Sequence, residues 1–302
     1  MRITRRRLMG GLAALPVVGA GRARALATVE AGGARLDLLS DGHLVLPRAF
    51  VFGPVPPDVT EEVAAEFGLG ESLLPDCTLT LWRDGTNTVL FDAGSGPAFQ
   101  PTAGRMLEDL ATIGVDPGEV THLVLTHGHP DHLWGAVDEF DEPLFPNAAH
   151  RIGRAERGYW TDPATLESIG AERQAFAVGA ARRLEQIASL TEAFEDGDEV
   201  APGVRARLTP GHTPGHMSFD LDLGGAPLTV IGDAVANHHV ALTHPAEETA
   251  QDQDPARAAR TRVALLDELA ESGARVVGFH FPHPGTGRIR REGDGFAFVP
   301  EG

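Results

Sequence analysis

The chain has 302 residues, of which 42% are hydrophobic, and this is enough apolar surface for one large α/β domain or two small ones. Its formal net charge of -18 argues against nucleic acid and against stable association with anionic membranes, because both partners attract basic surfaces. All 25 basic residues are arginine, so mechanisms that need a Schiff-base or phosphate-loop lysine are excluded.

The first 25 residues have the features of an export signal. The run Thr4-Arg5-Arg6-Arg7-Leu8-Met9 resembles the twin-arginine signal, a short apolar segment follows it, and Ala23-Arg24-Ala25 fits a cleavage site. The apolar segment is too short and too rich in glycine to span a bilayer. We therefore expect export to the periplasm, with residues 26–302 forming a single domain. The alternative is a basic N-terminus of a cytosolic protein.

The predicted elements alternate between strands and helices. Residues 35–46 have the pattern of a hairpin around Asp41-Gly42, and residues 78–92 that of another around Asp84-Gly85. The stretch from Pro54 onward resembles an exposed excursion between them. Later strands are expected at 122–125, 204–209, 217–223, 227–231 and 275–279, and helices at about 101–113, 171–190 and 255–272. This order suits an α/β fold, a four-layer αβ/βα sandwich in which two mixed sheets pack face to face.

Ligand-type side chains are concentrated directly after the predicted strands. His127, His129, Asp131 and His132 follow the strand 122–125, and Gly128 and Pro130 bend the chain so that side chains two apart converge. Similar positions are occupied in three later segments, Gly211-His-Thr-Pro-Gly-His216, Ile231-Gly-Asp233 and Phe279-His280. A surface histidine cluster does not explain this recurrence. The sequence therefore predicts a metal site.

These motifs resemble the metallo-β-lactamase superfamily across nearly all of residues 35–300. The resemblance implies two divalent metal ions, and imidazole with carboxylate suits zinc, though manganese, cobalt or iron also fits the ligand types. It implies one ion on His127, His129 and His212, a second on Asp131, His132 and His280, and Asp233 as the bridge between them. His216 matches no ligand of the family and is interpreted as structural or as support behind the ligands.

Within the superfamily, the chain departs from the true β-lactamases. Those enzymes carry a basic residue or serine at the position of His132 and often use a cysteine ligand, for which Cys77 is badly placed. Cys77 is instead interpreted as a small buried side chain. The segments Phe145-Pro-Asn-Ala and His280-Phe-Pro-His-Pro-Gly-Thr-Gly-Arg288 are most similar to the methyl parathion hydrolase-like group. The acyl-homoserine lactonases typically have a tyrosine where this chain has Ala236.

The resemblance implies hydrolysis of an ester-like bond in an aryl ester, a lactone or a phosphotriester. Two ions lower the pKa of a bridging water to give hydroxide near neutral pH, and they polarise the substrate oxygen. Asp131 and Asp233 are the expected catalytic carboxylates, Asp233 by orienting the nucleophile or accepting its proton. The expected partner is a small uncharged ester. Phe99, Trp160 and Phe176 stand where the parathion hydrolase-like group has pocket aromatics, and Asn237 to His239 follow the bridging residue.

Other interpretations stay open. A lactonase of the quorum-quenching type, an oxidoreductase and a metal-binding module all occur on this fold. A full set of seven ligands exceeds the need of a binding module, and the sequence contains no flavin fingerprint. The alternative for the three aromatic residues is a place in the hydrophobic core. The sequence does not distinguish a monomer from a homodimer.

Overall fold

The computed structural model describes residues 26–31 and 33–301. The expected export signal at residues 1–25 lies outside the described residues. Within the described part of the chain, no helix is both long and apolar enough to cross a membrane.

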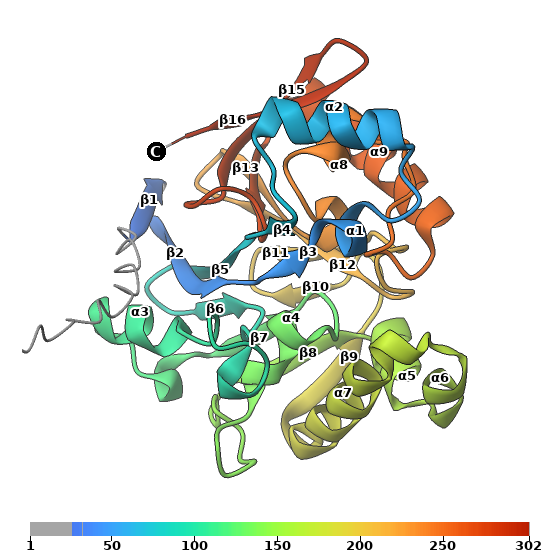
Figure 1. Cartoon of the computed structure of the whole chain (residues 1–302). Helices are drawn as coiled ribbons and strands as arrows, with labels where there is room; N and C mark the ends of the chain where they lie inside the picture. The colour runs from blue at the N-terminus through green and yellow to red at the C-terminus, as the bar shows by residue number, and fades with distance from the viewer. Residues whose placement is uncertain (1–25, 32, 302) are drawn as a thin grey trace, which may run out of the picture.

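Two seven-stranded sheets pack face to face and carry helices on their outer faces (Figure 1). In the first sheet the strand order is β1-β2-β5-β6-β7-β8-β9, and the strands from β6 to β9 run parallel. Its strands are β1 (Ala27–Ala31), β2 (Ala34–His43), β5 (Asp76–Arg83), β6 (Thr88–Phe91), β7 (His122–Leu125), β8 (Ala149–Gly153) and β9 (Thr191–Phe194).

The second sheet follows the order of the chain from β10 to β16, and only β13 and β14 run parallel. Its strands are β10 (Glu199–Ala201), β11 (Val204–Leu208), β12 (Met217–Asp222), β13 (Pro227–Gly232), β14 (Arg275–Gly278), β15 (Thr286–Glu292) and β16 (Gly295–Pro300). A separate two-stranded ladder joins β3 (Leu46–Pro47) and β4 (Ser72–Leu73).

The helices lie in two outer layers, with α3, α5 and α7 on one side of the molecule and α9 on the other (Figure 1). Their bounds are α1 (Arg48–Phe52), α2 (Pro57–Phe67), α3 (Met106–Thr112), α4 (Pro130–Leu133), α5 (Arg154–Thr161), α6 (Pro163–Ser168), α7 (Gln174–Gln186), α8 (Val240–Thr243) and α9 (Pro255–Ser272). Short 3-10 turns occur at Gly96–Ala98, Pro117–Glu119, Trp134–Ala136, Ala171–Arg173, Ala188–Leu190 and Asp233–Val235.

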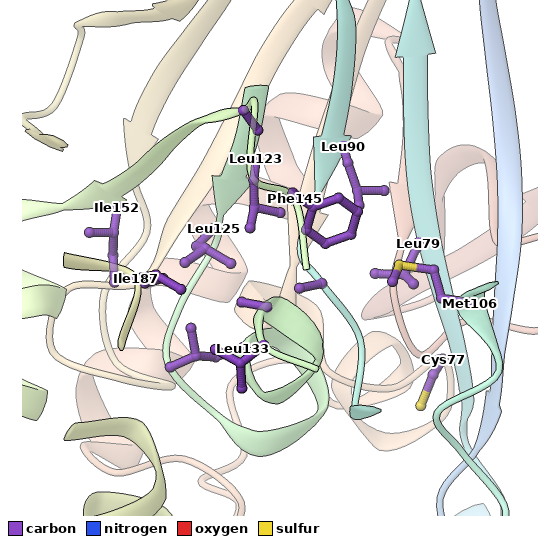
Figure 2. Packing of buried hydrophobic residues seen from close by; sticks show 14 of the residues in the cluster. Cys77, Leu79, Leu90, Met106, Leu123, Leu125, Leu133, Phe145, Ile152 and Ile187 are labelled. Carbon is purple, nitrogen blue, oxygen red and sulfur yellow. The ribbon is translucent and has the colours of Figure 1, made fainter. Parts of the chain in front are cut away.

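Alternating side chains along the strands separate the hydrophobic layers. On β7, Leu123 and Leu125 pack with the helices of the first sheet, as Figure 2 shows, whereas Val124 packs between the sheets. Phe219 of β12 meets it in the layer between the sheets, and Leu266 of α9 belongs to a third layer outside the second sheet. These layers confirm the α/β four-layer sandwich.

The predicted turn at Asp41-Gly42 is wrong. β2 continues through these residues with a bulge after Ser40, and it pairs with β5 as well as β1. The buried carboxylate of Asp41 accepts hydrogen bonds from three backbone N–H groups, those of Ser95, Gly104 and Met106. Asp41 therefore anchors the neighbouring loops, because its carboxylate accepts from loop N–H groups that have no partner in a sheet.

Other predicted elements fare better. The hairpin around Asp84-Gly85 is confirmed by the antiparallel pairing of β5 with β6. Asp254 caps α9 as expected, since its side chain accepts from the N–H of Arg257. The stretch from Pro54 is largely exposed as expected, but it contains a helix, α2, and the apolar side chains of α2 and of the preceding α1 pack against Val240.

Glu156 on α5 ties together the two loops that follow β7 and β11. It is completely buried, and its Oε1 accepts from Gly128 N at 2.9 Å and Trp160 Nε1 at 2.6 Å. Its Oε2 accepts from Thr213 Oγ1 at 2.7 Å and Gly215 N at 3.0 Å. Burial raises the pKa of Glu156, and the four donors oppose that shift. The carboxylate thus fixes the two histidine-bearing loops relative to each other.

Replacing Glu156 by Gln should lower the free energy of unfolding by about 2–4 kcal/mol, because an amide NH₂ would face two donors. Urea denaturation measures this change. Glu185→Gln on the exposed side of α7 is the charge-matched control, and it should shift the free energy by less than about 0.5 kcal/mol. Equal stability of E156Q and E185Q would show that the four hydrogen bonds do not hold the loops.

Candidate metal centre

The three imidazoles expected to hold one ion meet in the structure. His127 Nε2 lies 3.0 Å from His129 Nδ1, which lies 2.9 Å from His212 Nε2. Ligand atoms that surround a zinc ion at about 2.1 Å are separated by about 3.4 Å in a tetrahedral site. The three nitrogen atoms are therefore close enough to share one ion, and all three rings are buried.

The remaining predicted ligands form a second cluster beside the first. His280 Nε2 lies 3.2 Å from Asp131 Oδ2 and 3.4 Å from Asp233 Oδ2. His132 Nε2 lies 3.5 Å from Asp131 Oδ2 and 3.5 Å from Asp233 Oδ1. Asp233 Oδ2 is also 3.3 Å from His212 Nε2. Asp233 therefore stands between the two clusters, which is the placement expected of a bridging ligand.

Hydrogen bonds behind the rings determine which nitrogen faces the centre. Nδ1 of His132 lies 2.8 Å from Asp92 Oδ2, that of His212 lies 3.0 Å from Asp252 Oδ1, and that of His280 lies 2.8 Å from Asp76 O. Each of these acceptors requires a proton on Nδ1, so the neutral ring presents a bare lone pair at Nε2. Among the described residues, His132 Nε2 and Asp233 Oδ1 are buried without a hydrogen-bond partner. Divalent cations fit this donor set.

The charges of the cluster also favour a bound divalent cation. Burial and the neighbouring imidazoles lower the pKa of His127 and of His129 well below the ordinary value. Burial also opposes protonation of His132 and His280, but the carboxylates of Asp131 and Asp233 outweigh it and raise the pKa of both rings well above that value. The carboxylates thus demand positive charge between them, which a divalent ion supplies.

His216 holds the backbone of Asp233, in agreement with its interpretation as a supporting residue. The N–H of Asp233 donates to His216 Nε2 at 2.9 Å, and His216 Nδ1 lies 2.8 Å from Thr209 Oγ1. The chain of hydrogen bonds continues over 2.9 Å to Ser218 Oγ, which donates to Ile231 O at 3.1 Å. Burial lowers the pKa of His216 to about 3, so the neutral ring keeps its acceptor nitrogen.

The backbone around the ligands departs from the predicted loop in one respect. Residues Pro130–Leu133 form a single helical turn, α4, which carries Asp131 and His132, whereas His127 and His129 lie in the loop before it. Gly211, next to His212, has a φ of 133°, and a Cβ there would lie 2.3 Å from Ala258 N. A glycine is therefore required where this loop crosses the start of α9.

A cavity of about 250 Å³ opens onto both clusters. His129, Asp131 and Asp233 contribute to its wall, and Phe99 and Phe176 line it as predicted. The rest of the wall is mainly apolar and comes from Leu44, Leu46, Phe50, Val51, Leu69, Leu73, Leu74 and Pro75. Polar side chains enter it from Arg173, Asn237, His238, His239 and Gln251.

The prediction that Trp160 lines the pocket is wrong. Trp160 is 1% exposed and packs in the core of the first sheet, where its ring centroid lies 5.7 Å from that of His129. Its indole N–H donates to the buried carboxylate of Glu156. An indole that has both a buried partner and a core position stabilises the fold.

Cys77 lies nearer to the centre than the sequence suggested. Its Sγ is within 4.8 Å of ligand atoms of Asp131 and His280. Burial raises the pKa of Cys77 to about 11, so the side chain is a thiol at neutral pH. The expected small buried side chain is confirmed, but the expectation that Cys77 is badly placed for a ligand is not, because its sulfur lies beside Asp131 and His280.

The sequence did not reveal the acidic residues behind the rings. Asp92 follows β6 directly, and this position after a strand was a usable signal. Asp252 lies in a polar loop without such a signal, and in the structure it also contacts Thr249 Oγ1 at 2.8 Å and the buried Arg262 at 3.3 Å. Tertiary contacts alone identify it.

The lactonase AttM of Azorhizobium caulinodans, named as an N-acyl homoserine lactonase, is 33% identical over 178 residues, 56% of this chain and 61% of that protein. An uncharacterized protein of Mycobacterium bovis is 31% identical over 147 residues, 48% of this chain and 59% of that protein. The chain thus spans about three fifths of the length of these curated relatives.

Solved structures share the fold over most of the chain. AbOPH, described as a hydrolase in the beta lactamase superfamily, is 26% identical with a TM-score of 0.85, over 92% of this chain and 97% of that chain. AidC, described as a dizinc quorum-quenching lactonase, is 24% identical with a TM-score of 0.85 over the same shares. A family model described as the metallo-beta-lactamase superfamily matches residues 75–280, and together with this fold and ligand geometry it shows that the chain belongs to that superfamily.

Proposed function

We propose that the protein is a binuclear metal-dependent hydrolase of ester-like bonds. The observation that supports this most is Asp233, whose two carboxylate oxygens face both histidine clusters. His127, His129 and His212 would hold one ion, Asp131, His132 and His280 the other, and zinc suits this mixture of imidazole and carboxylate. Such ions supply an activated water and polarise the bond that is cleaved.

The protein's own residues prepare the site for that chemistry. Asp233 is the proposed proton acceptor, and His216 fixes its backbone from behind. Asp131 is the second proposed catalytic carboxylate, because its Oδ2 lies at the edge of the cavity between His132 and His280. The apolar wall excludes water from the substrate, and Phe99 and Phe176 offer aromatic surface to a flat leaving group.

Two substrate classes are supported by different observations. The similarity of the C-terminal segment to the methyl parathion hydrolase-like group supports aryl esters and phosphotriesters. The names of AttM and AidC support a lactone. Ala236 leaves the cavity wall without the tyrosine typical of lactonases, and we therefore rank aryl esters and phosphotriesters first. An optical spectrum that shows iron or flavin would instead favour an oxidoreductase, and metal binding without turnover would favour a binding module.

Zinc-loaded protein should contain two metal equivalents per chain by elemental analysis, since His127, His129 and His212 meet in one cluster and Asp131 lies close to His132 and His280 in another. Asp233→Asn should keep the fold but lower kcat/KM on aryl esters more than about 100-fold, because it weakens the ligand shared by both clusters. Exposed Asp294→Asn is the matched control and should match the wild type. A content of one metal equivalent or fewer per chain, together with full activity of D233N, would contradict the proposal.

Substrate class is tested with aryl esters, lactones and phosphotriesters, each assayed on zinc-loaded and chelated protein. Chelation should abolish turnover of every accepted class, because both clusters lose their cations. Turnover that survives complete removal of metal would exclude the binuclear mechanism.

We also propose export by the twin-arginine route, on the strength of Arg5, Arg6 and the sequence that follows them. Changing both residues to Lys should leave a precursor in the cytoplasm, because this route requires the arginine pair. Cell fractionation and N-terminal sequencing measure the outcome. Undiminished periplasmic recovery of the double variant, in a host that exports the wild type, would refute the proposal.

A further inference from the structure

Arg173 is a buried cation in the wall of the cavity. It ends the 3-10 turn before α7, is 9% exposed, and contributes the only arginine among the residues that line the cavity. Its guanidinium carbon lies 5.9 Å from the ring centroid of Phe50. Phe176, one helical turn further along, lies 6.0 Å from the ring of His129. The guanidinium therefore belongs to the wall beside the first histidine cluster.

The guanidinium has little compensation from the protein. Its Nη2 donates to the backbone oxygen of Ala250, and within the described part of the chain no carboxylate forms an ion pair with it. Asp252 is a buried carboxylate whose charge acts on Arg173, but its two oxygens already contact His212, Thr249 and Arg262. Burial lowers the pKa of Arg173, although Glu172 and Asp252 oppose the shift.

A guanidinium carries five N–H donors in a rigid fork. Within the described residues its acceptor is the oxygen of Ala250, so most of these donors have no protein partner, and the ring of Phe50 offers no oxygen. No nitrogen atom of Arg173 is buried without a partner, so its remaining donors are accessible from the cavity and can receive an oxygen acceptor or anion there. Since the guanidinium lines the cavity, an incoming ligand is the group that can supply this acceptor.

We propose that Arg173 forms a subsite for a second oxygen acceptor on the substrate, a carboxylate or an amide carbonyl separate from the bond that is cleaved. This inference rests on the proposed hydrolase function and narrows its substrates. The acceptor lies on the side of the cavity formed by Arg173 and Phe176, while the ester-like group lies at the two clusters. Arg173 is thus a specificity residue.

The test uses three para-nitrophenyl esters whose acyl chains have equal length and end in a methyl group, a primary amide or a carboxylate. Zinc-loaded wild type should favour one or both polar ends over methyl in kcat/KM. Arg173→Met should lower kcat/KM for the favoured ester about 10- to 100-fold and change the methyl ester less than about 3-fold. Arg173→Lys should recover part of the preference, because it restores the charge without the fork.

Exposed Arg260→Met on α9 removes one positive charge away from the cavity and should behave as wild type. Metal content and melting temperature of all variants identify any change that comes from misfolding or lost zinc. An equal loss on all three esters in R173M, or no loss on any, would overturn the subsite. The ester with the larger loss shows whether the acceptor is anionic or neutral.

If the wild type cleaves none of the esters, the hydrolase proposal fails separately from the subsite. Binding of the matching para-nitrophenyl ethers, which have no cleavable bond, is then measured by calorimetry on wild type and R173M. Tighter binding of a polar-ended ether, lost in R173M, supports the subsite. Equal binding of all three ethers to both proteins excludes it.

Discussion

Compensation of buried charge is the constraint on which the site depends. Five imidazoles and two carboxylates meet in a largely buried place at the base of the cavity, and each would be costly there without a partner. Hydrogen bonds behind the rings point Nε2 of His132 and His280 inward, and the carboxylates of Asp131 and Asp233 favour positive charge beside them, as the raised pKa of both rings shows. Metal binding and folding of the site are therefore linked, because bound cations compensate the buried carboxylates and use the ring nitrogen atoms.

The ligands come from both sheets, so their alignment depends on residues that join the two halves. Glu156 connects the loop after β7 with the loop after β11. The parallel pairs β6–β7 and β13–β14 bring further ligands to the ends of adjacent strands. A site assembled this way relies on a second set of buried polar groups, each satisfied by hydrogen bonds, as much as on the ligands themselves.

Short spacing and position after strands were enough for the sequence to select the ligand-type side chains that the structure brings together. The sequence did not predict Glu156, since an acidic residue on an amphipathic helix resembles a solvent-exposed one. Trp160 was wrongly assigned to the cavity wall because the sequence does not show that Glu156 is buried and accepts its indole N–H. The turn expected at Asp41-Gly42 failed because the Asp41 carboxylate pairs with distant backbone groups instead of closing a hairpin. Local patterns do not contain such long-range hydrogen bonds.

The segment from Leu44 to Pro75, with α1 and α2, supplies most of the apolar cavity wall and none of the seven expected ligands. Its helices form their own small core with Val240. Mutations in this segment would therefore alter which molecules fit without disturbing the residues expected to react with them. Natural selection can therefore act on substrate choice and on reactivity through separate stretches of one gene. Related enzymes can in this way acquire different substrates while they keep the same reactive residues.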